Sequence, residues 1–242
     1  MLSLAGLCKD RLHDSCRRRN KSLPFTENGW KGGGRRMERV IAYVDGFNLY
    51  FGMKEKGWER YLWLNVEALV LNLLKPGQRL VLTKYFTSRV SGTVRDPGKP
   101  RRQNAYLEAL QTVTGLGIFY GHYLPKNVQC FSCGATWVSH EEKMTDVNIA
   151  VAMILDAFDD RFDTALLITG DSDLRAPVAE MCKRFPKKRL IVAFPPARES
   201  AVLQRAAHAA FMIGRKKLAD SQFPEEVEKP GGIKLRRPAS WK

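Results

Sequence analysis

The stretch Ala165-Leu166-Leu167-Ile168-Thr169, followed at once by Gly170-Asp171-Ser172-Asp173, decides the fold class. The first part is almost wholly apolar and shows no alternation of polar and apolar side chains. Strands of this kind belong to parallel sheets that helices cover on both faces. The abrupt change to glycine, aspartate and serine predicts that the strand ends there, and a helix is expected to follow through Phe185.

Strand and helix patterns alternate on both sides of this stretch. The expected strands cover residues 39–44, 80–86, 118–123, 165–169 and 189–194. The other expected helices cover 65–74, 101–113, 145–158 (with Thr145 as its N-cap) and 199–210. Alternation of this kind implies right-handed crossovers between parallel strands. We therefore predict a single three-layer α/β domain over residues 39–220, with a mostly parallel sheet of about five strands.

Two basic segments flank this domain. Residues 1–36 lack a periodic apolar pattern and hold nine basic and three acidic residues, which predicts a disordered basic arm. Residues 224–242 hold five basic and three acidic residues and are expected to form a flexible tail.

Charge and composition narrow the function classes. The chain has 40 Lys and Arg against 25 Asp and Glu, a net charge of +15, of which +7 lies between the two flanking segments. A basic folded body favours a polyanionic partner such as RNA or DNA. The five cysteines are an odd number, which argues against a disulfide framework, and no apolar run reaches the ~18 residues of a membrane span. A cytoplasmic protein without a membrane segment is the expectation.

Acidic residues gather where the expected strands end. Asp45 follows the first strand, Asp171 and Asp173 follow the fourth, and Asp146 opens the helix at 145–158. In open parallel sheets the active site lies beyond the carboxyl ends of the strands. Repulsion between converging carboxylates would raise their pKa values unless a cation neutralised them, and Mg²⁺ or Mn²⁺ prefers such oxygen ligands. Taken singly, each acid also fits a helix cap, a turn or a first-turn charge.

Three separated motifs resemble the NYN domain, of the LabA-like kind within the PIN-like nuclease superfamily. They are Val44-Asp45-Gly46-Phe47-Asn48, Lys143-Met144-Thr145-Asp146-Val147-Asn148-Ile149-Ala150 and Thr169-Gly170-Asp171-Ser172-Asp173-Leu174. The resemblance implies a Rossmann-like PIN fold and a metal-dependent ribonuclease that hydrolyses RNA phosphodiester bonds. By motif position it also implies a metal-binding set of Asp45, Asp146, Asp171 and Asp173, with Asn48 lining the same site.

Basic residues near these motifs are candidates for contacts with the RNA backbone. Lys143 precedes Asp146 by three residues, and Arg101 and Arg102 lie on the helix at 101–113. Lys84, Arg89 and Lys99 are weaker candidates. For any one of them a solvated surface position is an equally good explanation.

Cys130 and Cys133 have the spacing of half a zinc site, with His122 and His140 at a reasonable distance. Without a second such pair, we prefer unligated thiols on a hairpin to structural Zn²⁺.

Two other enzyme classes fit poorly. A haloacid-dehalogenase-type phosphatase needs an acid where Phe47 stands, and a dinucleotide-binding enzyme needs its glycines after the first strand, whereas Gly32–Gly34 precede it. The serious alternative is a non-catalytic RNA-binding or regulatory module with the same fold. Oligomeric state stays open, a homodimer included.

Overall fold

The computed structural model describes residues 36–92, 96–129 and 131–241, apart from the side chains of 122–127 and 137–143. The basic arm expected over residues 1–36 therefore lies outside the described residues, except for Arg36. None of the helices in these described ranges has the length and apolar character that crossing a bilayer requires.

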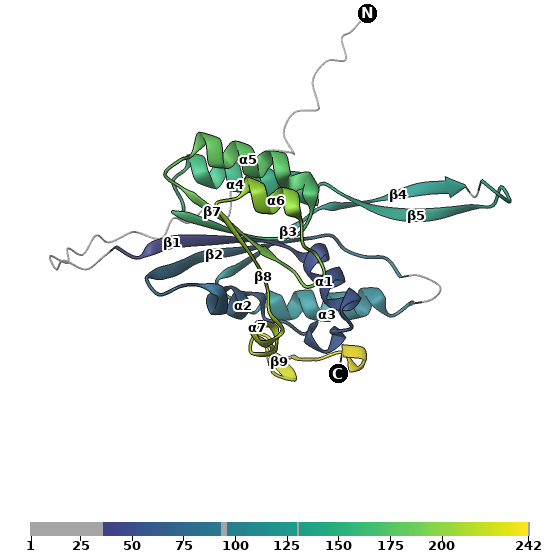
Figure 1. Cartoon of the computed structure of the whole chain (residues 1–242). Helices are drawn as coiled ribbons and strands as arrows, with labels where there is room; N and C mark the ends of the chain where they lie inside the picture. The colour runs from purple at the N-terminus through teal and green to yellow at the C-terminus, as the bar shows by residue number, and fades with distance from the viewer. Residues whose placement is uncertain (1–35, 93–95, 130, 242) are drawn as a thin grey trace, which may run out of the picture. The chain divides into compact units, whose positions relative to one another are not determined.

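Six parallel strands form the central sheet, in the order β3-β2-β1-β6-β7-β8 (Figure 1). They are β1 (Glu38–Asp45), β2 (Gln78–Thr87), β3 (Leu116–Tyr120), β6 (Thr164–Ile168), β7 (Arg189–Phe194) and β8 (Ala209–Met212). From β1 the chain proceeds to one edge of the sheet, and from β6 it proceeds to the other. The border between β1 and β6 is therefore the topological switch point, where α/β folds place their sites.

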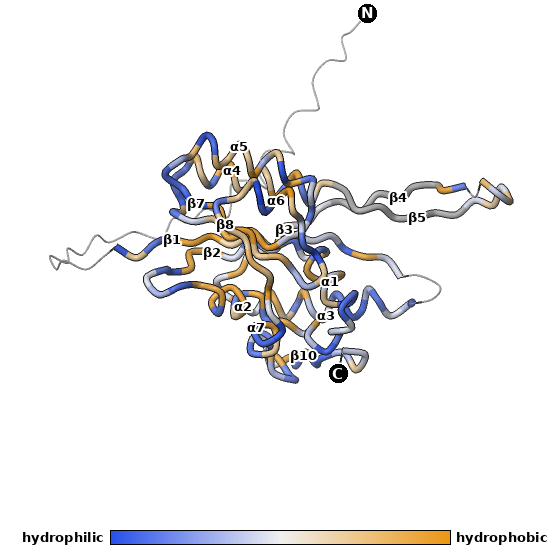
Figure 2. The backbone as a smooth tube through the Cα atoms, in the orientation of Figure 1, coloured by the Kyte–Doolittle hydropathy of each residue, from blue (hydrophilic) through white to orange (hydrophobic). Residues whose placement is uncertain are grey.

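Helices cover both faces of the sheet and make three layers (Figure 1). One face carries α1 (Gly46–Glu55), α2 (Val66–Leu73), α3 (Lys99–Leu110) and α7 (Arg215–Ala219); the other carries α4 (Thr145–Phe158), α5 (Arg175–Arg184) and α6 (Ala201–Ala206). Alternate residues of β1 enter the two cores: Val40, Ala42 and Val44 face α1 and α2, whereas Ile41 and Tyr43 face α4 and α5. Figure 2 shows the hydrophobic residues following the central strands. The predicted three-layer α/β fold is confirmed.

The sheet has one strand more than the five expected. Strand β8 falls partly within residues 199–210, for which a helix is predicted, but α6 ends at Ala206. The alanines of this segment favour a helix when taken alone. Pairing with the exposed edge of β7 overrides that preference, with Ile191 opposite Ala209 and Phe194 opposite Met212.

The connection from the sheet to α4 also differs from expectation. The strand expected at 118–123 divides into β3 and β4 (His122–Gln129), and β4 pairs antiparallel with β5 (Thr136–Lys143). Met144, with φ 81°, then stands at the N-cap position of α4 without a side-chain hydrogen bond, so Thr145 is the first helical residue rather than the cap. Met144, in the left-handed region, thus makes the turn between strand β5 and helix α4.

The segment after Pro224 is folded, which differs from the expected flexible tail. Short strands β9 (Glu226–Glu228) and β10 (Lys234–Arg236) pair antiparallel, and Trp241 in η3 (Ala239–Trp241) is 6% exposed. The Trp241 ring centroid lies 6.4 Å from that of Trp63 and 5.9 Å from that of Tyr106. The buried indole of Trp241 therefore anchors the last segment to the domain. The many charged, proline and glycine residues of this segment had suggested a flexible tail.

A buried ionic cluster joins α4 to the sheet. Asp156 is 2% exposed and accepts hydrogen bonds from the Tyr43 hydroxyl at 2.7 Å and the Arg161 guanidinium at 2.9 Å. Lys84, which is 6% exposed, completes the cluster, with its ammonium group 2.5 Å from the Asp156 carboxylate. Lys84 is therefore a structural partner of Asp156 and not the phosphate contact suggested by its place in the sequence.

Substitution of Asp156 by Ala should destabilise the domain by about 3–5 kcal/mol, because it leaves the Lys84 charge buried without a partner. Glu180→Ala is the matched control, since it removes the exposed helix pair between Glu180 and Arg184. Urea denaturation followed by circular dichroism measures both. Equal midpoints for the two variants would contradict this role for Asp156.

Candidate metal centre

The acidic residues singled out in the sequence meet at the switch point. Asp45 is the last residue of β1, and Asp146 lies in the first turn of α4. Asp171 precedes η2 (Ser172–Leu174), just after β6, and Asp173 lies within η2. Asp45, Asn48, Asp146 and Asp171 line one cleft of about 270 Å³. Elements far apart in the sequence thus bring their carboxylates to one rim of the sheet.

Three of the carboxylates form a tight group. One oxygen each from Asp146, Asp171 and Asp173 lie within 4.8 Å of one another. Asp146 and Asp171 are partly buried, and Asp173 is exposed. Carboxylate oxygens at this spacing suit a hard divalent cation. A cluster of three aspartates that could bind a divalent metal is therefore present.

Asp45 lies outside this group, at the buried wall of the cleft, with 4% of its surface exposed. One carboxylate oxygen accepts the Asn48 backbone N–H at 3.0 Å and so caps α1, and the other accepts the Thr169 hydroxyl at 3.0 Å. Burial raises the pKa of Asp45 to about 6, against the lowering effect of these hydrogen bonds, and Asp171 adds to the rise. The Asp45 carboxylate thus both holds the helix start and adds negative potential to the cleft.

The pKa of Asp146 is raised in the same way. Burial, and to a lesser extent the charges of Asp45, Asp171 and Asp173, raise its pKa to about 6. Burial and repulsion between neighbouring carboxylates both favour the neutral acid, and a bound cation would offset both effects. The donor set and its charge both fit a bound Mg²⁺ or Mn²⁺ ion.

Asn48 ties the two halves of the rim together. Its side-chain oxygen accepts the Gly170 backbone N–H at 2.8 Å, which links α1 to the loop after β6. A Cβ atom on Gly170 would lie 1.9 Å from the Arg198 carbonyl oxygen, so only glycine fits this approach. Asp171 then accepts the Asp173 backbone N–H at 3.0 Å. Asp171 is therefore the N-cap of η2.

Comparison with known proteins agrees with this geometry. The family model described as NYN domain matches residues 39–213. The chain belongs to the NYN domain family. This confirms the resemblance seen in the three motifs and the PIN-like character of the fold.

Two individual proteins show a distant similarity to this NYN domain protein. The chain is 26% identical over 241 residues to the 6-hydroxy-3-succinoylpyridine 3-monooxygenase HspA of Pseudomonas putida, with 84% of this chain and 75% of that protein aligned. A crystal structure of a protein of unknown function from Vibrio parahaemolyticus superposes with a TM-score of 0.49 and 20% identity, over 78% of this chain and 99% of that one.

Arg198 is the cleft residue that sequence reasoning missed. It lines the NYN cleft from the loop after β7, and its guanidinium lies 2.7 Å from the Glu55 carboxylate. Among the described residues it is the one cation in the cleft lining. Its place at the carboxyl end of a strand was the available signal, but no motif marks it.

Two of the basic residues suggested for RNA contact, Arg101 and Arg102, do not line the acidic cleft. Arg101 is exposed, and Arg102 pairs with Asp96 and lines a neighbouring hollow rather than the acidic cleft. The side chain of Lys143 lies outside the described part of the structure. Cys133 is exposed in the turn between β4 and β5, whereas Cys130 and the side chains of His122 and His140 are outside the described residues. Structural zinc there stays a prediction.

Substitution of Asp146 by Asn should stabilise the metal-free domain at neutral pH. The folded-state pKa of about 6 exceeds the ordinary value of 3.8, so the native state binds the proton more tightly. Protonation of Asp146 therefore stabilises the folded wild-type protein. This contribution is complete below about pH 4 and is lost as the pH rises through 6. In EDTA at pH 7.5 we expect a gain of about 1 kcal/mol after allowance for solvent screening, or roughly 2–4 °C in Tm.

Thermal unfolding of both proteins from pH 4 to pH 8 measures this effect, with Asp159→Asn, an exposed acid at the other end of α4, as control. The gain should shrink towards pH 4. Added Mn²⁺ should raise the Tm of the wild-type protein more than that of Asp146→Asn. A pH-independent gain would contradict the charge repulsion described above.

Proposed function

We propose that this NYN domain protein is a ribonuclease that depends on a divalent metal, Mg²⁺ or Mn²⁺. The observation that supports this most directly is the group of Asp146, Asp171 and Asp173, whose carboxylate oxygens lie within 4.8 Å at the switch point. The net charge of +15 supports a polyanionic substrate. The family match supports a nuclease-like site.

The residues have separate tasks in this proposal. Asp146 and Asp171 hold the metal ion, and Asp45 contributes charge, directly or through water, from the buried wall. Bound there, such an ion lowers the pKa of a water and stabilises charge on the phosphate oxygens. Asp173, the exposed member, orients the attacking water. Asn48 holds the Gly170 loop in place, and Arg198 is positioned to contact the phosphate. Water attack of this kind leaves a 5′-phosphate and a 3′-hydroxyl.

The name of the P. putida relative describes oxygenation of a pyridine compound, which is a different chemistry. The lining of the acidic cleft in the described residues includes no histidine or cysteine. Non-haem iron oxygenases typically use two histidines with one carboxylate, whereas Mg²⁺ and Mn²⁺ favour carboxylates and water. The donor set therefore favours hydrolysis over oxygenation.

The test is cleavage of labelled single-stranded RNA by the purified full chain with Mn²⁺, with Mg²⁺ and with EDTA. We expect cleavage that requires the metal and falls at least about 100-fold in Asp146→Asn and Asp171→Asn. Asp159→Asn should retain full activity, because this exposed acid lies at the far end of α4 from Asp146.

RNA binding without metal-dependent cleavage in the wild-type protein would replace the ribonuclease by the non-catalytic binding module. Cleavage that Asp146→Asn leaves intact would reject the assigned site and point to a contaminating nuclease.

A further inference from the structure

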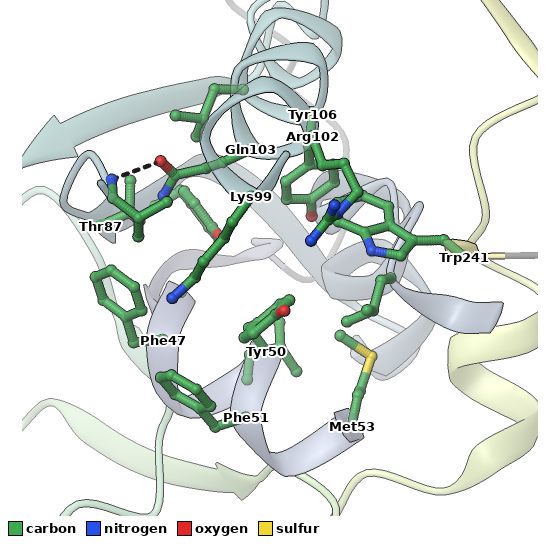
Figure 3. A pocket seen from close by; sticks show the side chains of 16 residues that line it. Phe47, Tyr50, Phe51, Met53, Thr87, Lys99, Arg102, Gln103, Tyr106 and Trp241 are labelled. Carbon is green, nitrogen blue, oxygen red and sulfur yellow. Dashed lines mark hydrogen bonds between the residues drawn. The ribbon is translucent and has the colours of Figure 1, made fainter. Parts of the chain in front are cut away.

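A second hollow begins where the acidic cleft ends. Phe47 and Phe51, one turn apart on α1, line both the cleft and this hollow. Figure 3 shows Phe47, Tyr50 and Phe51 of α1 facing Lys99 and Arg102 of α3 across it. A ligand that occupies the cleft and extends past Phe47 and Phe51 must therefore reach the hollow.

The hollow combines an apolar floor with a cationic side. Tyr85, Tyr106 and Trp241 contribute to the floor, whereas Lys99, Arg102 and Gln103 contribute the polar groups. This combination suits a planar aromatic ring that is linked to a negatively charged group. A nucleotide has this composition.

The size of the hollow decides where such a ring can lie. Its volume is about 50 Å³. A cavity of ~150 Å³ is what accommodates a benzene molecule, so a nucleobase cannot enter. It must lie across the mouth, against Phe47 and Phe51. We call these two side chains the aromatic platform.

The platform is open to a stacking partner. The rings of Phe47 and Phe51 stack on each other with centroids 6.1 Å apart and an interplanar angle of 20°. Phe51 is 42% exposed, and neither Phe47 nor Phe51 belongs to the two hydrophobic cores. Core packing therefore does not account for this ring.

Lys99 supplies the cation beside the platform. Its ammonium group forms no ion pair with another described residue; the charge of Asp96, which pairs with Arg102, also acts on it. Figure 3 shows the Lys99 side chain reaching from α3 towards Phe47 and Tyr50. A phosphate next to a base on the platform would lie within its reach.

Building on the proposed ribonuclease function, we propose that the aromatic platform stacks the base of the nucleotide next to the scissile phosphate, while Lys99 contacts the next phosphate. A base can stack on a side chain only when it has left its own helix. The substrate class is therefore single-stranded RNA, with little preference for sequence, because every base offers a π face.

Binding of tetranucleotides in EDTA tests the platform without turnover. The probes are a tetra-adenylate with one 2-aminopurine and a ribose-phosphate tetramer without bases. Phe51→Ala should weaken binding of the tetra-adenylate about 5- to 100-fold and abolish the quenching of 2-aminopurine, but leave binding of the base-free tetramer unchanged. Phe51→Trp should restore binding. Phe158→Ala, another exposed ring at the end of α4, is the matched control.

The salt dependence of binding tests Lys99. Lys99→Gln should lower the slope of log K against log salt by about 0.7, the value for one phosphate of a single strand. Lys183→Gln, an exposed lysine on α5, should leave the slope unchanged.

Equal weakening of both tetramers by Phe51→Ala, or no weakening of either, would overturn the platform. Undetectable binding would also overturn the platform. Competition by AMP that is as strong as competition by the tetranucleotide would overturn it too, because it would indicate a mononucleotide site. The ribonuclease proposal is judged separately by metal-dependent cleavage. Cleavage with an unaffected Phe51→Ala rejects the platform alone, whereas the expected binding pattern without cleavage rejects the ribonuclease alone.

Discussion

Negative charge concentrated at the ends of β1 and β6 is the constraint on which the rest of the site depends. Four carboxylates converge in a protein of net charge +15, and burial together with their mutual repulsion raises the pKa values of Asp45 and Asp146 to about 6. Hydrogen bonds from Thr169 and the start of α1 hold Asp45 in place despite this repulsion. The hydrogen bond from the Gly170 backbone N–H to the Asn48 side chain holds the loop after β6 next to α1. The fold thus holds in place a charge arrangement that a divalent cation would relieve.

Helix α4 connects the acidic site to the hydrophobic core. Asp146 stands in its first turn, and Asp156 is buried near its other end against Lys84 and Tyr43 of the sheet. The ion pair costs desolvation energy, and its strength depends on complete pairing. Through Tyr43 and Lys84, Asp156 ties the helix to β1 and β2. The position of Asp146 relative to Asp45 follows from that attachment.

The sequence predicted those parts of the molecule that local patterns encode. Apolar strands ending in Asp45 and Asp171 indicated both the parallel sheet and its acidic rim. Contacts between distant segments were not encoded locally. Strand β8 forms because β7 offers an edge, and Trp241 folds the last segment because Trp63 and Tyr106 surround it. Arg198 enters the cleft through a loop without a motif. The sequence suggested that Lys84 lies at the surface, because its buried partner Asp156 is far away along the chain.

The separation of opposite charges around the cleft has a chemical reason. A free lysine among Asp146, Asp171 and Asp173 would pair with the carboxylates and compete with a metal ion for them. The one cation in the described cleft lining, Arg198, is engaged by Glu55, and Lys99 lies beyond the aromatic platform. Phosphates can then be held on either side of the acids without neutralising them. For the RNA substrate that we propose, this arrangement favours a strand that crosses the cleft, with its bases turned towards Phe47 and Phe51, over a small molecule bound at the acids alone.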